Sequence, residues 1–198
     1  MKTKLSVLFL ILASVANTFG QTKTNLEIIN ALISQSVAHA DSILGGKQTI
    51  NLKVETPSAL EVLKPKIFEA FIAKGYSIKT GTDLSEKSVD YTLFTVKTEY
   101  ENSYSDGIFG GTMVERNVML DASLIIKSGD KPIMPVQFHK EYLDTVNLNN
   151  IHAVENQVLP FTHAELPSLP LLSNLWEPII VVGTLTVTVI LLFTVRSK

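Results

Sequence analysis

The stretch MVERNVMLDASLIIK, residues 113–127, alternates apolar and polar side chains almost without a break. Strict alternation over this length predicts a long β-strand with one buried face and one solvated face. The apolar set comprises Val114, Val118, Leu120, Ala122, Leu124 and Ile126. The polar set comprises Glu115, Asn117, Asp121, Ser123 and Lys127.

Two further strands are expected beside this one, at residues 90–101 and 133–144. Residues 128–130 supply a tight turn before the later strand. In each strand alternate residues should share a face. We expect the core to take Phe94, Val96, Thr98 and Tyr100 from the earlier strand, and Val136, Phe138 and Tyr142 from the later one.

The chain before these strands changes to a helical period. Apolar residues recur at steps of three and four from Leu26 to Leu44, which predicts an amphipathic helix that ends at Gly45–Gly46. A strand at 49–55 follows. Thr56 then caps a second helix, with Pro57 as its first residue, that carries Leu60, Leu63, Ile67, Phe68, Phe71 and Ile72 to Gly75 and that Pro65 kinks or divides.

A short strand at 76–79 leads to the three long strands, and residues 147–157 favour a short helix. The fold class predicted is therefore α+β, with helices packed on one face of a mostly antiparallel sheet.

The N-terminus has the pattern of a secretory signal peptide. Lys2 and Lys4 precede an apolar run that ends in small and polar residues. We predict a signal peptide at residues 1–20 with cleavage after Gly20; cleavage after Ala16, or an uncleaved anchor, are the alternatives.

The C-terminus has the pattern of a membrane span. Residues 179–195 carry no charge, and a helix of this length covers roughly 25 Å. Trp176 suits the outer membrane interface, and Arg196 and Lys198 form a basic flank on the inner side. We predict a transmembrane helix at 178–195 and a cytoplasmic tail at 196–198.

Everything between these ends should then lie outside the cytoplasm. Residues 21–177 hold 13 basic and 19 acidic side chains, a formal charge of −6, which makes nucleic acid a poor partner. The chain has no cysteine and so no disulfide framework. We predict a periplasmic domain at 21–158 and a stalk at 159–177, in a single-pass protein of the bacterial inner membrane.

The residues reveal no reaction. No nucleophile elbow, zinc-protease motif or phosphate loop is present, so we assign no catalytic residue and no cofactor. The four histidines lack ligand spacing, and we predict no metal site. Glu99 and Glu101, with Asp106 nearby, could bind Ca²⁺, although solvated charges on a sheet are far more common.

Two features favour binding instead. Ile108 and Phe109 are large apolar residues at the tip of a hairpin, where they could enter a partner's groove or touch lipid. Arg116 falls on the apolar face of its strand, where a lone charge is costly. Either that face is open there, for a partner, or an acid such as Asp90 or Glu99 meets it, and we favour the structural pair. Lys140 interrupts the later strand in the same way and marks a sheet edge.

The order of elements supports one resemblance. A helix, a strand, a second helix ending in Gly75-Tyr76, and then Val89-Asp90-Tyr91-Thr92-Leu93 opening long antiparallel strands resemble small periplasmic lipoproteins of the bacterial envelope. These are of the curli-secretion, penicillin-binding-protein-activator and transport-auxiliary type. The chain departs from them by lacking a lipidated cysteine. The resemblance implies non-enzymatic partner binding in envelope assembly or transport.

Three classes of function remain. The first is a membrane-anchored interaction or assembly subunit, with the bilayer and an envelope protein as partners. The second is a tethered carrier of a small ligand or lipid, with a cleft between helices and sheet. The third is an enzyme whose polar groups only the fold brings together.

Overall fold

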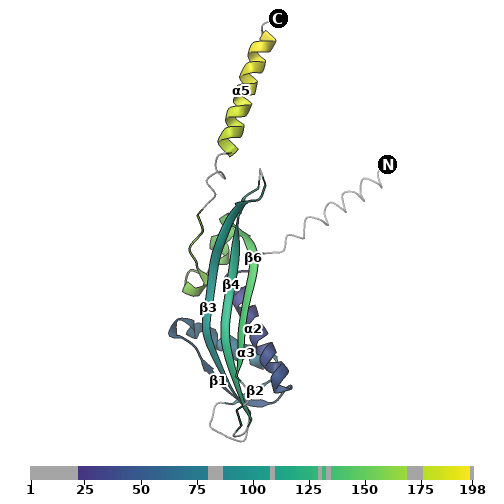
Figure 1. The fold of residues 1–198 in the computed structure, drawn as a ribbon, viewed down its shortest axis with the longest axis vertical. Coiled ribbons are helices and arrows are strands. Elements are labelled where there is room, and N and C mark those ends of the chain that lie inside the picture. Colours follow the sequence, from purple (N-terminus) through teal and green to yellow (C-terminus); the bar gives the residue numbers. More distant parts are fainter. Residues whose placement is uncertain are drawn as a thin grey trace, which may run out of the picture.

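The computed structural model describes residues 22–79, 87–107, 110–128, 131–132, 135–168 and 176–196. The predicted signal peptide lies outside these residues. Within them the chain forms an α+β fold with a six-stranded sheet (Figure 1).

The sheet runs in the order β2-β1-β3-β4-β5, and β6 also pairs with β4. Both β5 and β6 pair antiparallel with β4, as β3 does, whereas β1 is parallel to β2 and to β3. The strands are β1 (Thr49–Glu55), β2 (Ser77–Lys79), β3 (Lys87–Ser105), β4 (Thr112–Ser128), β5 (Lys131–Pro132) and β6 (Val136–Asn147).

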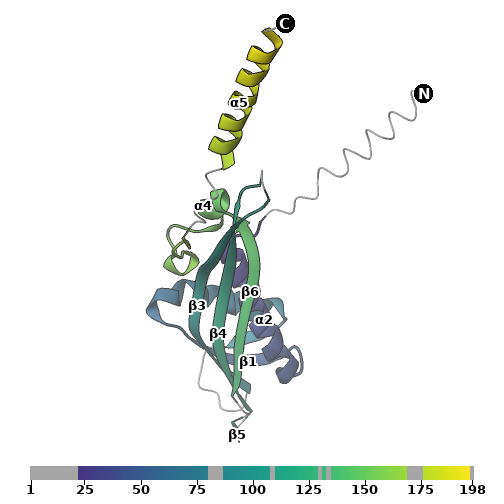
Figure 2. The same cartoon turned by 45° about the horizontal axis from the view of Figure 1, so that its top comes forward.

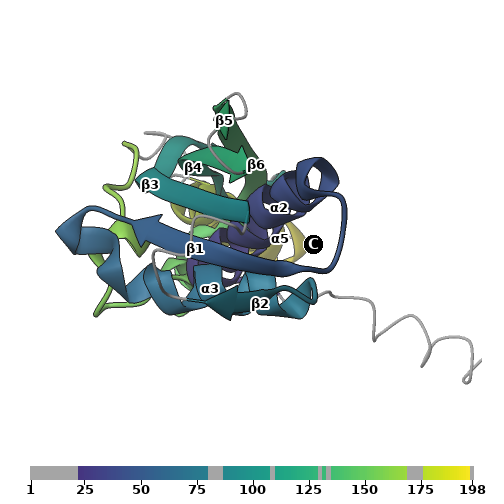
Figure 3. The ribbon, with the colours of Figure 1, turned by 90° about the horizontal axis from the view of Figure 1, so that it is seen from below.

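Two α-helices lie on one face of this sheet, α2 (Asn25–Leu44) and α3 (Lys64–Ala73) (Figures 1 and 3). A capping box begins α2, because the Thr24 hydroxyl accepts from the backbone of Glu27 and the Glu27 carboxylate accepts from the Thr24 N–H. Gly45 ends it at a φ of 79°, which favours glycine. The predicted first helix is confirmed.

The second predicted helix is divided at Pro65. A 3₁₀ helix, η1 (Ser58–Leu63), comes first, and α3 follows with Pro65 in its first turn. Thr56 is not a cap as predicted: its hydroxyl is buried and has no hydrogen-bond partner. The prediction that Ile72 faces the core is also wrong, since Ile72 is 59% exposed.

Tyr76 and Tyr91 attach α2 to the rest of the core. The Tyr91 hydroxyl lies 2.7 Å from the Ser36 hydroxyl, and the Tyr76 hydroxyl donates to Asp41 at 2.5 Å. Both rings meet the ring of Phe71 edge to face, which is a preferred aromatic arrangement. Burial raises the pKa of Tyr91 to about 12, so its hydroxyl stays protonated.

The register of β3 shifts at a bulge between Leu93 and Thr95. Before the bulge the buried residues are Val89, Tyr91 and Leu93; after it they are Val96, Thr98 and Tyr100. Phe94 is therefore 54% exposed, against the prediction that it lies in the core. A bulge inserts one residue and moves later side chains to the other parity, so both sets reach one core.

The later part of the chain returns to the sheet. After β6 come η2 (Leu148–Asn150) and α4 (Ile151–Val154), which confirm the short helix, and then η3 (Pro160–Thr162). Residues 163–168, here called the strap, run alongside β3 in Figure 1. The first part of the segment predicted as a stalk thus contacts the sheet, because Phe161 packs against the main core.

The last element is α5 (Trp176–Arg196), which stands apart from the sheet in Figures 1 and 2. Its described large apolar side chains are all exposed, from 39% at Ile180 to 74% at Phe193. Over the residues that the structure describes, no helix meets the combined length and hydropathy expected of a membrane span.

The bulge can be tested by two neighbouring substitutions in β3. Leu93→Ala should lower the free energy of unfolding by about 2–5 kcal/mol, because it empties a fully buried site. Phe94→Ala should cost less than about 1 kcal/mol, because its ring is largely in solvent. Urea unfolding of the full chain in detergent measures both; a larger loss for Phe94→Ala would contradict the shift of register.

Candidate functional site: a buried polar junction and the groove beside β3

The side chain of Arg116 is completely buried at one end of the sheet. Its Nε and Nη2 donate to the two carboxylate oxygens of Asp144, at 2.7 and 2.5 Å. Its Nη1 donates to the Lys23 carbonyl at 2.8 Å and to the Asn25 Oδ1 at 2.7 Å. A paired, hydrogen-bonded guanidinium of this kind is stable in an interior.

The partner of Arg116 is Asp144, and neither Asp90 nor Glu99. Arg116 and Asp144 face each other across the β4–β6 ladder. Asp90 pairs with Lys127 at 2.7 Å, and Glu99 pairs with Lys97. The structural pair that the sequence favoured is present, but the acid comes from the other neighbouring strand.

Asn25, the first residue of α2, connects this pair to the end of the domain. Its amide nitrogen donates to the Tyr100 hydroxyl at 3.1 Å and to the Thr162 carbonyl at 2.7 Å. Burial raises the pKa of Tyr100 to about 12, and the nearby Glu155 carboxylate acts in the same direction. We call Arg116, Asp144, Asn25, Tyr100 and Thr162 the junction. It joins α2, β3, β4, β6 and η3.

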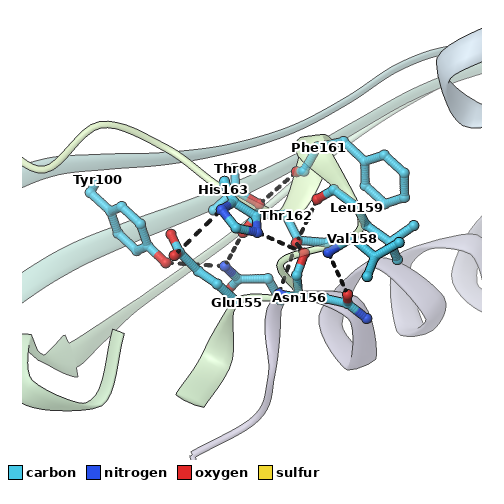
Figure 4. Close-up of polar contacts among 10 residues, drawn as sticks. Thr98, Tyr100, Glu155, Asn156, Val158, Leu159, Phe161, Thr162 and His163 are labelled. Carbon is cyan, nitrogen blue, oxygen red and sulfur yellow. Dashed lines mark hydrogen bonds and ion pairs between the residues drawn. The ribbon is translucent and has the colours of Figure 1, made fainter. Parts of the chain in front are cut away.

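Side chains of the segment from Glu155 to His163 form hydrogen bonds with the backbone of the same segment (Figure 4). The Thr162 hydroxyl lies 2.8 Å from the Leu159 carbonyl and accepts from the Asn156 N–H at 3.0 Å. His163 Nε2 donates to the Asn156 carbonyl at 2.7 Å, since a carbonyl only accepts. Its Nδ1 lies 3.7 Å from the carboxylate of Glu155.

A groove of about 330 Å³ lies between β3 and this segment. The Thr98 hydroxyl, in the middle of the β3 residues that line it, donates to the Phe161 carbonyl at 3.1 Å. Further along β3, the Ser103 hydroxyl donates to the Ser168 carbonyl at 2.9 Å. We call this hollow the β3 groove. Its lining residues are Val96, Lys97, Thr98, Glu99, Tyr100, Pro160, Phe161, His163, Ala164 and Glu165.

A second hollow, of about 350 Å³, lies over β4 between β3 and β6. Its lining residues include Arg116 and Asp144, so the buried ion pair forms part of its wall; the others are Glu101, Glu115, Leu143 and Thr145. The Asn102 amide donates to Glu115 at 2.7 Å. No group of three or more histidine, aspartate or glutamate side chains suited to a metal ion occurs among the described residues.

The other predicted site residues are not brought together with these. Ile108, Phe109 and Lys198 lie outside the described residues, and Trp176 and Arg196 are the two end residues of α5. The β3 groove has no sequence signal of its own, because it depends on where residues 159–168 pack.

The similarity of this chain to known proteins is found among solved structures. No protein-family model matches the chain, and no curated protein matches its sequence. Among solved structures, a neuraminyllactose-binding hemagglutinin homolog from Helicobacter pylori is 14% identical over 49% of this chain, with a TM-score of 0.27. This chain covers 64% of that protein, so it spans less than two thirds of its length.

Two bacterial lipoproteins give similar values. Rare lipoprotein B from Shewanella oneidensis is 15% identical, with coverage of 48% of this chain and 69% of that one and a TM-score of 0.28. A minor lipoprotein from Acinetobacter baumannii is 14% identical, with 67% and 86% coverage and a TM-score of 0.32. These likenesses are distant, at 14–15% identity and TM-scores of 0.27–0.32.

The Arg116–Asp144 ion pair predicts that a single and a double variant will lose different amounts of stability. Asp144→Ala should lower the free energy of unfolding by about 3–5 kcal/mol, because it leaves the buried guanidinium unpaired. The double variant Arg116→Met with Asp144→Leu should lose clearly less, because no uncompensated charge remains. Urea unfolding of the full chain measures both. A double variant as unstable as Asp144→Ala would refute the importance of the unpaired charge.

The outer sheet face carries a titratable pair that gives a pH prediction. His139 Nδ1 lies 2.5 Å from Asp121 Oδ1, and this hydrogen bond, followed by the charge of Asp121 and by Glu141, raises the pKa of His139 above 6.5. The stability from this contact is complete below the unfolded-state pKa and is lost as pH rises through the folded-state pKa. NMR titration should show Asp121→Asn lowering the pKa of His139; an unchanged value would contradict the pairing.

Proposed function

We propose that the protein is a non-enzymatic interaction or assembly subunit of the bacterial envelope, with its α+β domain in the periplasm and α5 as its anchor in the inner membrane. The observation that carries this proposal is the exposure of the apolar side chains of α5. A helix that is apolar on every side needs lipid or protein around it. Residues 179–195 carry no charge and, as a helix, extend roughly 25 Å.

The threonines of α5 are compatible with a lipid environment. Thr184, Thr186 and Thr188 each donate a hydrogen bond to the carbonyl four residues earlier, at 2.7–2.9 Å. A hydroxyl paired in this way leaves no unsatisfied donor in the hydrocarbon region. The basic residues Arg196 and Lys198 follow the apolar run, which favours a cytoplasmic C-terminus.

The polar residues of the domain support a binding role. Arg116, Asn25 and Thr162, the most deeply buried polar side chains of the junction, bond to one another, to Asp144, to Tyr100 or to the backbone. These contacts hold α2, β3, β4, β6 and η3 in place. Among the described residues, the surfaces proposed for a partner are the outer face of the sheet and the β3 groove; the predicted tip at Ile108 and Phe109 lies outside the described residues.

One substitution in α5 tests anchoring and partner binding together. Val187 lies near the centre of residues 179–195, and an arginine at the centre of a span opposes insertion by about 2.5–3.5 kcal/mol. Val187→Arg should move the protein from the carbonate-resistant membrane fraction to the soluble fraction, and the matched control Val187→Leu should not.

The same variants serve to test assembly. After mild crosslinking in native membranes, a C-terminally tagged wild-type chain should recover a stoichiometric envelope partner, as should Val187→Leu. Recovery of the wild-type chain alone at monomer mass would refute the assembly role. Bound lipid or ligand in that monomer would favour the carrier function, and equal membrane retention of Val187→Arg would refute the anchor.

A further inference from the structure

The edge of β3 is only partly covered by β1. The last pair of the parallel β1–β3 ladder is Glu55 with Thr92, whereas β3 continues to Ser105. Among the described residues no other strand pairs with that edge. The backbone N–H and C=O groups that point from residues 93–105 to this side are therefore outside any ladder, and such an edge readily accepts another strand.

The strap covers this edge without forming a ladder. It runs parallel to β3, since Thr98 and Ser103 contact Phe161 and Ser168 in the same chain order. Both contacts use a side chain of β3, and the described residues show no backbone-to-backbone hydrogen bond between the strap and β3. The strap therefore does not pair with the backbone groups of β3, and a strand could do so if the strap moved aside.

The β3 groove lies where an added strand would run. Its floor is five consecutive residues of β3, 96–100, a length of roughly 16 Å at the usual rise of a strand. It also continues the line of β1 along the same edge of the sheet. An incoming strand there would thus extend the existing β1–β3 ladder past Thr92.

We propose that the β3 groove binds an extended peptide segment of a partner protein, which adds to the sheet as a strand beside β3. This deepens, and rests on, the proposed interaction function. An extended peptide presents main-chain donors and acceptors at the spacing that the β3 edge requires, and a lipid chain has none.

The residues that line the β3 groove also determine which side chains of the peptide would fit. Val96, Tyr100 and Phe161 offer apolar contacts. Lys97 and Glu99 pair with each other, whereas Glu165 is exposed and has no ion pair among the described residues. A peptide with alternate apolar residues and one lysine or arginine near Glu165 therefore complements the groove.

The test uses the full chain in lipid nanodiscs and phage-displayed random heptapeptides as probe. The peptide enriched over empty nanodiscs is synthesised and methylated at one backbone nitrogen at a time. Strand addition predicts at least a tenfold loss of affinity at every second position and little loss between them, because alternate N–H groups point to β3. Uniform tolerance of methylation, or no enriched peptide, would overturn the inference.

A variant in the groove gives a second readout. Ala164→Trp should fill the hollow and weaken binding of the same peptide at least tenfold, and the matched control Ala164→Ser should not. Circular dichroism and urea unfolding establish that both variants fold. Equal peptide affinity for the two would refute the groove as the site. If Ala164→Trp also recovers its envelope partner normally while no peptide binds, the assembly function stands and the peptide site is wrong.

Discussion

The buried guanidinium of Arg116 is the constraint on which the arrangement of this domain depends. An interior charge is tolerated only where its donors are paired, and here the partners come from Asp144, Asn25 and the backbone of Lys23. These groups belong to β6 and to the beginning of α2, which are more than a hundred residues apart in sequence. The pairing therefore fixes the helix over the sheet and β6 beside β4 at the same time.

From this pair the polar contacts lead directly to the C-terminal part of the domain. Asn25 bonds to Arg116 with its oxygen and to the Thr162 carbonyl with its nitrogen, so the start of α2 holds η3 against β3. The strap begins at η3, and its path along the edge of β3 follows from that attachment. The β3 groove is thus a consequence of a structural ion pair, although no residue of that pair lines it.

Periodicity predicted the first helix and the long strands, because burial on one face leaves a regular pattern in the sequence, but it did not predict β5 or η3. It also did not predict the β3 bulge, which moves the buried side chains from one parity (Val89, Tyr91 and Leu93) to the other (Val96, Thr98 and Tyr100). Phe94 has the parity of the second set but precedes the shift, and it is therefore exposed. The partner of Arg116 could not be predicted from the sequence, for a similar reason. Asp90, Glu99 and Asp144 all lie on strands next to β4, and only the register places Asp144 opposite Arg116.

The apolar surface of α5 and the unpaired edge of β3 differ in the kind of partner that each requires. The apolar side chains of α5 need only an apolar environment, which lipid supplies without any specific geometry. The free edge of β3 needs donors and acceptors in a fixed order, which only another backbone supplies. A chain that leaves the first to the bilayer and the second to a peptide would hold a partner segment beside the membrane.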